Sequence, residues 1–278
     1  MTVQFQYLTH PLINRNGYSL WLPGRIIKGL KNFKEPDIYS EDLVQQYPLG
    51  TKLEFADGRV FRYGKHGATS TSPPMARMVM NANLCPGAPG DPDVDGFEGD
   101  LHTAAVAGDE DVDLEIATAY AENFFEDGML AVYTDSSPAH YVEYRIAGSE
   151  LGDGTYCRVY LEKALKKAIT ATEGITAYKS LFSQLKVVGA EGGGFVSAMG
   201  ASLCSPFTVD YFSWIQRRGR CIVTPTAYFG DTADERMAQM HSDGTIALKA
   251  GHGTHTVGYL TQRTELNYGD LEVWLQLE

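Results

Sequence analysis

Three aspartates at alternate positions are the first candidates for chemistry. Asp91, Asp93 and Asp95 precede a glycine, which is how a calcium-binding loop of hard oxygen ligands begins. The twelfth position of such a loop needs a bidentate carboxylate, but the chain has His102 there, and Pro92 occupies the second position. No amphipathic helix is expected on either side. We keep the three aspartates as a candidate calcium site and favour a solvated acidic loop.

A second candidate is the histidine pair His252 and His255, in the segment Gly-His-Gly-Thr-His-Thr. It resembles the histidine motif of subtilisin-like serine proteases, in which the first histidine is the general base for a serine far downstream. Only 20 residues follow Gly258 and none of them is a serine. We therefore expect a glycine-rich loop with solvated histidines. Since no other segment matches a catalytic or phosphate-binding motif, we expect no enzyme activity and no cofactor.

Acidic residues are concentrated in one part of the chain. Thirteen of the 35 Asp and Glu residues lie between residues 81 and 130, where there is no Lys or Arg, so this segment accounts for the net charge of −12. A surface that binds nucleic acid needs clustered Lys and Arg. We therefore expect no direct contact with nucleic acid, and we expect the acidic segment to face solvent.

The composition favours a β-rich globular protein. The chain has 278 residues, of which 44% are hydrophobic, and its 29 Gly and 12 Pro favour many turns over long helices. Its 16 Tyr, 12 Phe and 3 Trp favour strands. We predict an all-β fold, mainly an antiparallel sandwich or barrel-like structure, with an extended N-terminal arm and long irregular loops.

Alternating segments give the expected strands. The clearest is a hairpin in which residues 53–55 and 60–63 flank the Asp57-Gly58 turn. This hairpin and the segment 211–216 are the candidate core elements. Further strands are expected at 112–116, 129–134, 141–146, 156–161, 220–224, 245–248, 256–260 and 271–277.

Three parts are expected along the chain. Residues 1–48 are interrupted by turn signals and predict an arm that becomes ordered only by docking on another surface. Residues 49–190 are expected to form a β-rich domain with a long acidic loop at 81–115, where prolines and glycines are frequent. Residues 191–278 are a C-terminal β-rich part, belonging either to the same domain or to a separate one.

One segment has a helical pattern. Apolar residues at 161, 164, 165, 168 and 169 follow the spacing of an amphipathic helix, and charged residues occupy the other face. The periodicity alone therefore predicts a helix from Leu161 to Ile169, with strand and loop as the open alternative.

The four cysteines, at positions 85, 157, 204 and 221, are far apart and form no Cys-x-x-Cys pair. We expect buried free thiols, and neither a zinc site nor a disulfide framework. The chain has no run of about 18 apolar residues, and its first residues lack the basic and apolar regions of a signal peptide. We expect no membrane span and no export.

Several short segments resemble structural proteins of tailed-phage virions, and together they span most of residues 47–278. The acidic segment 81–115 has no counterpart in that group. The matching segments, in chain order, are YPLGT at 47–51, DGRVFRY at 57–63, KHGA at 65–68, DGML at 127–130, YVEYRI at 141–146, YFSWIQRRGRC at 211–221, HSDGT at 241–245, VGY at 257–259 and the strand at 271–277.

The resemblance implies a capsid decoration protein, also called a cement protein, which has a β-rich fold and stabilises the lattice of the major capsid protein. It implies that residues 161–169 belong to a strand, a loop and a strand. The expected partners are the major capsid protein and further copies of this chain, in a homo-oligomer for which we expect a trimer. The expected location is the outer surface of the virion capsid, after synthesis in the host cytoplasm.

Two other functions stay open from the sequence. The chain has a plausible size for the major capsid protein itself, although that fold resembles a domain around a long spine helix, and no stretch here has the required periodicity. A calcium-dependent adhesion or carbohydrate-binding module would use Trp214, Trp274 or the Asp91 segment.

Overall fold

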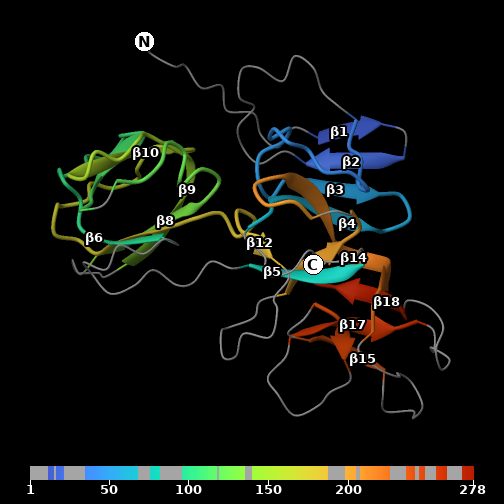
Figure 1. The fold of residues 1–278 in the computed structure, drawn as a ribbon. Coiled ribbons are helices and arrows are strands. Elements are labelled where there is room, and N and C mark those ends of the chain that lie inside the picture. The colour runs from blue at the N-terminus through green and yellow to red at the C-terminus, as the bar shows by residue number, and fades with distance from the viewer. Residues whose placement is uncertain are drawn as a thin grey trace. The chain divides into compact units, whose positions relative to one another are not determined.

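The computed structural model shows strands and turns, and no helix, in the residues that it describes (Figure 1). The predicted all-β fold, mainly antiparallel, is confirmed for this part of the chain. The described residues are 12–15, 17–21, 35–67, 76–81, 96–117, 119–134, 140–186, 198–204, 207–225, 236–241, 244–247, 255–261 and 271–278.

The chain divides into two compact units. Unit 1 contains Met1–Ala82 and Phe182–Glu278, and unit 2 contains Asn83–Leu181. The chain leaves unit 1 after β5 (Arg77–Asn81) and returns just before β12 (Leu185–Lys186), and these two strands pair antiparallel with Leu185 opposite Asn81. Because the exit and the return lie side by side in unit 1, unit 2 is an insertion between two neighbouring strands.

Unit 1 contains twelve described strands in one hydrogen-bonded sheet. Its main path runs β1-β2-β3-β4-β14-β18-β17-β15-β16, and β13 joins β14 to β5, which in turn pairs with β12. Besides β5 and β12, the strands of this sheet are β1 (Leu12–Arg15), β2 (Tyr18–Trp21), β3 (Lys52–Phe55), β4 (Val60–Lys65), β13 (Ala198–Ser202), β14 (Phe212–Val223), β15 (Met237–Met240), β16 (Ile246–Ala247), β17 (Thr256–Leu260) and β18 (Leu271–Gln276).

Strand β14 pairs with strands from the N-terminal part and from the C-terminal part of the chain. Its first half pairs with β4, and its second half pairs with β18. The expected boundaries at residues 48/49 and 190/191 therefore differ from the compact units, since one sheet contains strands from before residue 82 and after residue 182. Turn signals report local breaks in the chain and carry no information on strands that pair over 150 residues.

The predicted hairpin at the Asp57-Gly58 turn is confirmed. Strands β3 and β4 pair with Leu53 opposite Phe61, and the N–H of Gly58 donates to the carbonyl of Phe55 at 3.0 Å. Gly58 has a φ of 86°, a conformation that favours glycine. The strands expected at 211–216 and 220–224 form one continuous strand, β14.

The N-terminal segment requires a correction. We expected an arm over residues 1–48, but β1 and β2 form a hairpin whose second strand pairs with β3. Tyr18, Leu20, Ile38 and Tyr47 are buried in the aromatic core of unit 1, together with Trp214. The described residues of this segment are therefore part of unit 1, because their alternating apolar side chains complete its core.

In its described residues, unit 2 is a six-stranded antiparallel sheet that curves into a barrel. Its strand order is β6-β11-β8-β9-β10-β7. The residues directly after β6 bridge to β7, since the N–H of Glu115 donates to Asp100 O and the N–H of His102 donates to Asp113 O. This contact closes the sheet on itself. The strands are β6 (Gly96–Gly99), β7 (Asp111–Glu115), β8 (Met129–Thr134), β9 (His140–Ser149), β10 (Tyr156–Leu161) and β11 (Ile175–Tyr178).

The helix that periodicity predicted at Leu161–Ile169 is wrong. Leu161 ends β10, and the backbone of the following residues bonds to the segment before β7: Leu165 N donates to Asp109 O, and Ile169 N donates to Ala105 O. Leu165 and Ile169 are buried in the barrel core. The apolar residues after β10 therefore belong to a loop that covers one side of this core.

The expected acidic loop at 81–115 also requires a correction. Residues 96–99 and 111–115 of that stretch are strands β6 and β7 of the barrel. In β7 the acidic side chains alternate with Val112 and Leu114, which are buried, so the carboxylates face outward. High charge density on alternate residues is compatible with a strand when its other face is apolar.

Candidate functional site

Most of the candidate residues from the sequence lie outside the described structure. This holds for the calcium candidate Asp91, Asp93 and Asp95 and for His252. Within the described ranges, no three His, Cys, Asp or Glu side chains are grouped closely enough to hold a metal ion. His255 is described and has a structural contact, since the N–H of residue 198 in β13 donates to its Nδ1 at 3.0 Å.

The buried thiols and Trp214 are core groups. Cys157, Cys204 and Cys221 are buried and free, as predicted, and Cys85 lies outside the described residues. Burial raises the pKa of Cys157 to about 11 and that of Cys221 to about 12, so both thiols stay protonated near neutral pH. Trp214 is 1% exposed and therefore presents no ring face to a sugar.

A buried histidine–serine pair is a feature that the sequence did not reveal. His66 and Ser213 lie 147 residues apart, and His66 Nε2 is 2.6 Å from Ser213 Oγ. His66 Nδ1 is 2.9 Å from the carbonyl of Thr208, so this nitrogen donates and Nε2 accepts from the serine hydroxyl. The His66 ring also stacks on Phe207. His66 directly follows β4 and Ser213 is in β14, and both are almost fully buried, so the pair joins these two segments away from solvent.

We expect His66 to make unit 1 sensitive to acid. Burial lowers the pKa of His66 to about 4, against about 6.5 in an unfolded chain. Between these values the unfolded state binds the extra proton, so the contribution of this residue to stability falls as pH falls, by up to about 1.4 kcal/mol per pH unit.

Urea unfolding at pH 7 and pH 5 tests this expectation. His66→Gln should reduce the loss of stability between the two pH values, whereas His102→Gln, a change on unit 2, should leave it as in the original protein. Equal pH dependence in all three proteins would contradict it.

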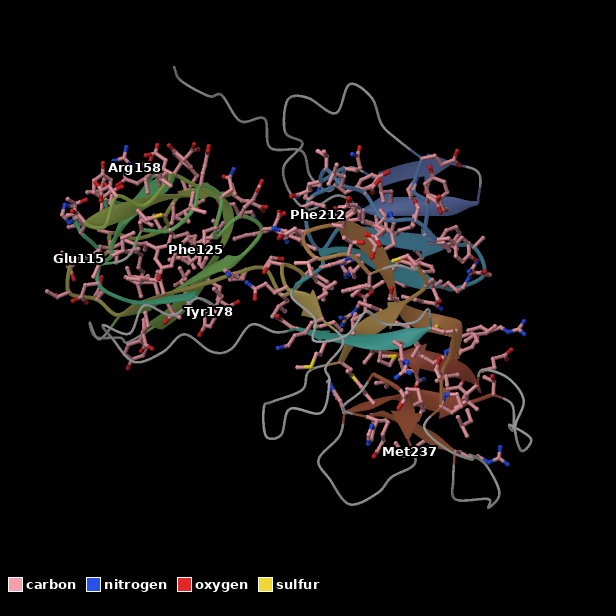
Figure 2. The ribbon with its side chains drawn as sticks, in the orientation of Figure 1. Glu115, Phe125, Arg158, Tyr178, Phe212 and Met237 are labelled. Atoms are coloured by element: carbon pink, nitrogen blue, oxygen red, sulfur yellow. The ribbon has the colours of Figure 1, made fainter. Side chains whose placement is uncertain are left out.

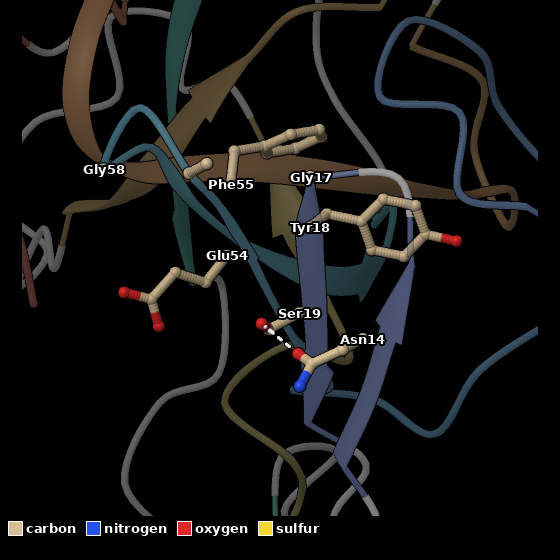
Figure 3. Close-up of a pocket in the computed structure, with 8 residues that line it drawn as sticks. Asn14, Gly17, Tyr18, Ser19, Glu54, Phe55 and Gly58 are labelled. Carbon is tan, nitrogen blue, oxygen red and sulfur yellow. Dashed lines mark hydrogen bonds between the residues drawn. The ribbon is translucent and has the colours of Figure 1, made fainter.

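One hollow of about 640 Å³ lies between the turns of the first two hairpins of unit 1 (Figure 3). Its lining combines the small residues Gly17, Ala56 and Gly58 with the side chains of Tyr18 and Phe55. Its polar side chains are occupied by each other or by neighbours: Ser19 Oγ donates to Asn14 Oδ1, and the Glu54 carboxylate pairs with Lys52 at 2.9 Å. The hollow therefore presents little polar functionality to a ligand.

An apolar row crosses the outer face of the sheet in unit 1. Met237 of β15 lies opposite Tyr259 of β17, and Tyr259 lies opposite Trp274 of β18, so the three side chains share one face. Met237 is 52% exposed, Tyr259 is 41% exposed, and Trp274 is half-buried. Met237 is labelled in Figure 2. We call Met237, Tyr259 and Trp274 the apolar row.

The two units differ strongly in charge. Residues 83–181 contain nineteen acidic and six basic residues, a net charge of −13. The remaining residues, which make up unit 1, contain sixteen acidic and seventeen basic residues, a net charge of +1. The nearly neutral unit is therefore the one that carries the apolar row, and the inserted barrel carries the charge of the whole chain.

The comparisons with known proteins give no relative. No family model, no curated protein and no solved structure matches this chain. The described part of the chain also contains no helix of the length and hydropathy needed to cross a membrane.

Proposed function

We propose that this protein is a structural component of a tailed-phage virion, which decorates the capsid and stabilises it by binding the lattice of the major capsid protein and further copies of itself. The role needs contact area and no catalysis. The observation that supports the proposal is the apolar row on nearly neutral unit 1. The resemblance of segments in both units to virion proteins favours a lattice as the partner.

Burial of apolar side chains, repeated over many copies, would supply the stabilisation. Covering a large apolar side chain completely contributes about 1.5–3 kcal/mol, so covering the exposed halves of Met237 and Tyr259 contributes roughly 1–3 kcal/mol per copy. This gain comes without the electrostatic repulsion that a highly charged docking face would cause. The −13 charge of unit 2 keeps the assembled particles apart in solution.

Binding to capsid shells tests the proposal. We expect the double variant Met237→Lys, Tyr259→Lys to bind shells of the major capsid protein at least about tenfold more weakly, because lysine on a covered face loses the apolar contact and must be desolvated. The matched control is Val106→Lys, Leu151→Lys, which changes two side chains of unit 2 that are 61% and 69% exposed.

Co-sedimentation of purified protein with shells measures the binding, and release of DNA from heated particles measures the stabilisation. Equal binding of the two double variants would contradict the role of the apolar row. If the original protein neither binds shells nor delays the release of DNA, the proposed function is wrong.

A further inference from the structure

Two neighbouring aliphatic side chains of unit 1 project into solvent. Leu43 is 67% exposed and Val44 is 66% exposed, in the bend that follows Asp42. Elsewhere in the described part of the chain, no two consecutive large apolar side chains are both exposed. Single exposed apolar residues are common on protein surfaces, whereas adjacent ones in a fixed position are candidates for a contact. We call Leu43 and Val44 the aliphatic tip.

The bend that carries the aliphatic tip is held by hydrogen bonds. Asp42 and Phe212 of β14 exchange two backbone bonds, with N···O distances of 2.7 and 2.9 Å. The hydroxyl of Tyr63 donates to the Asp42 carboxylate at 3.0 Å and accepts from the N–H of Gln46 at 3.2 Å. The Gln46 amide donates to the carbonyl of Val44 at 2.9 Å. The tip is therefore fixed in its exposed position, so a partner that covers it pays little ordering entropy.

The segment around the tip is anchored on both sides and is acidic. The Glu41 carboxylate accepts from the backbone N–H of Thr208 at 3.2 Å and from its hydroxyl at 3.1 Å. Ile38 and Tyr47, before and after the bend, are buried in the aromatic core of unit 1. Residues 35–46 contain four acidic residues and no Lys or Arg. The aliphatic tip is therefore flanked by negative charge.

A second hollow of unit 1, of about 600 Å³, lies beside the second half of β14. Its lining includes the apolar or aromatic side chains of Tyr39, Leu203, Ile222 and Trp274. Ile222 is 52% exposed, so this lining is open to solvent. The volume is within the range of pockets that enclose a small ligand, and two aliphatic side chains fit inside it.

The rim of the second hollow is weakly basic. Arg59 pairs with Asp57 at 2.7 Å, and Arg220 pairs with Glu272. Arg218, two residues before Arg220 on the same face of β14, is exposed and has no carboxylate partner within the described ranges. The rim therefore has three arginines and two carboxylates, and its sign is opposite to that of the segment around the aliphatic tip.

We propose that the aliphatic tip of one copy of the chain binds in the second hollow of another copy. The tip supplies uncharged branched side chains to an apolar lining, and the acidic segment beside it meets the basic rim. Within one copy the two do not meet, since Leu43 and Val44 do not line the hollow and are exposed. Both sides of the contact are thus available to a second copy.

The contact joins two different surfaces, so the assembly is head-to-tail. Each copy offers one tip and one hollow, and a heterologous contact of this kind closes into a ring when the rotation between copies permits. The inference concerns contacts between copies and does not depend on the capsid role. The shell-binding experiment tests that role separately, with changes at Met237 and Tyr259, which do not line the second hollow.

Complementation between two variants tests this inference. Leu43→Lys with Val44→Lys removes the tip and keeps the hollow, and Ile222→Lys places a charge in the hollow and keeps the tip. By sedimentation equilibrium, we expect the original protein to self-associate and each variant to do so at least about tenfold more weakly, because lysine loses the apolar contact and must be desolvated. An equimolar mixture of the variants should form a complex of two chains, because the tip of one enters the hollow of the other.

The matched control is Val106→Lys with Leu151→Lys on unit 2, whose side chains are 61% and 69% exposed. This control should associate as the original protein does. A monomeric original protein, equal association of the tip variant and the control, or a mixture that stays monomeric would overturn the inference.

Disulfide trapping checks the position of the contact independently of the charge changes. Val44→Cys and Ile222→Cys are made in separate proteins that also carry Cys85→Ser, since the other three cysteines are buried. After mixing and oxidation, we expect a disulfide-linked dimer of the two proteins, whereas Val106→Cys mixed with Ile222→Cys should give none. Equal yields from the two mixtures would show that the tip does not enter the hollow.

Discussion

Gly258→Ala is expected to lower the free energy of unfolding of unit 1 by about 3–5 kcal/mol, at the upper end of what single substitutions do. A Cβ at this position would lie 2.0 Å from the carbonyl oxygen of Trp274 and 3.1 Å from Leu275 Cα. Both atoms belong to the backbone of β18, which is held by β14 on its other edge. The clash therefore cannot be relieved by a side-chain movement and must displace a central strand.

Urea unfolding followed by tryptophan fluorescence measures this effect, because all three tryptophans of the chain are in unit 1. The matched control is Val209→Ala in the same unit, which shortens a side chain that is 44% exposed. We expect the control to change stability by less than about 0.5 kcal/mol. A midpoint for Gly258→Ala close to that of the control would contradict the packing of β17 against β18.

Phe125→Ala is expected to lower the stability of unit 2 by about 3–5 kcal/mol and to leave unit 1 unchanged. Phe125 is fully buried in the barrel core, where its ring contacts those of Tyr120 and Phe124 at centroid distances of 5.1 and 4.9 Å (Figure 2). Its loss leaves a cavity that the closed barrel does not easily fill.

Two probes separate the units in this experiment. Tryptophan fluorescence should give an unchanged transition, whereas far-ultraviolet circular dichroism should show a second transition at lower urea concentration. Tyr133→Ala, which removes a ring that is 52% exposed, is the control and should shift neither transition strongly. A fluorescence transition that moves together with that of unit 2 would show that the chain unfolds as a single cooperative body.

Local signals in the sequence were sufficient for the strands with clear alternation or a defined turn, but the sequence analysis missed β1, β2, β5, β6, β11, β12, β13 and β15. The Asp57-Gly58 turn requires a glycine at positive φ, and the alternation of Val112 and Leu114 with acidic residues marks β7 as a half-buried strand. The helix at 161–169 was wrong because three of the five apolar residues at helical spacing, Leu161, Leu165 and Ile169, enter the barrel core from the end of β10 and from the irregular loop after it. Periodicity reports which side chains are covered, and the partner decides the backbone conformation.

The features closest to function depend on long-range pairing, which one sequence does not contain. The apolar row joins residues of β15, β17 and β18 that are far apart along the chain, so the sequence does not indicate that they share one face. The pair of His66 and Ser213 is 147 residues apart. The insertion of unit 2 follows from Leu185 lying opposite Asn81, across more than 100 residues. Alternation gave the face of each strand but not its neighbours.

A reconstruction of the intact particle at side-chain resolution tests the central claim most directly. We expect the chain to be present on the capsid in many copies, with Met237 and Tyr259 covered by the major capsid protein or by a neighbouring copy. Particles that contain the chain with both side chains facing solvent, or particles that lack the chain altogether, would contradict it.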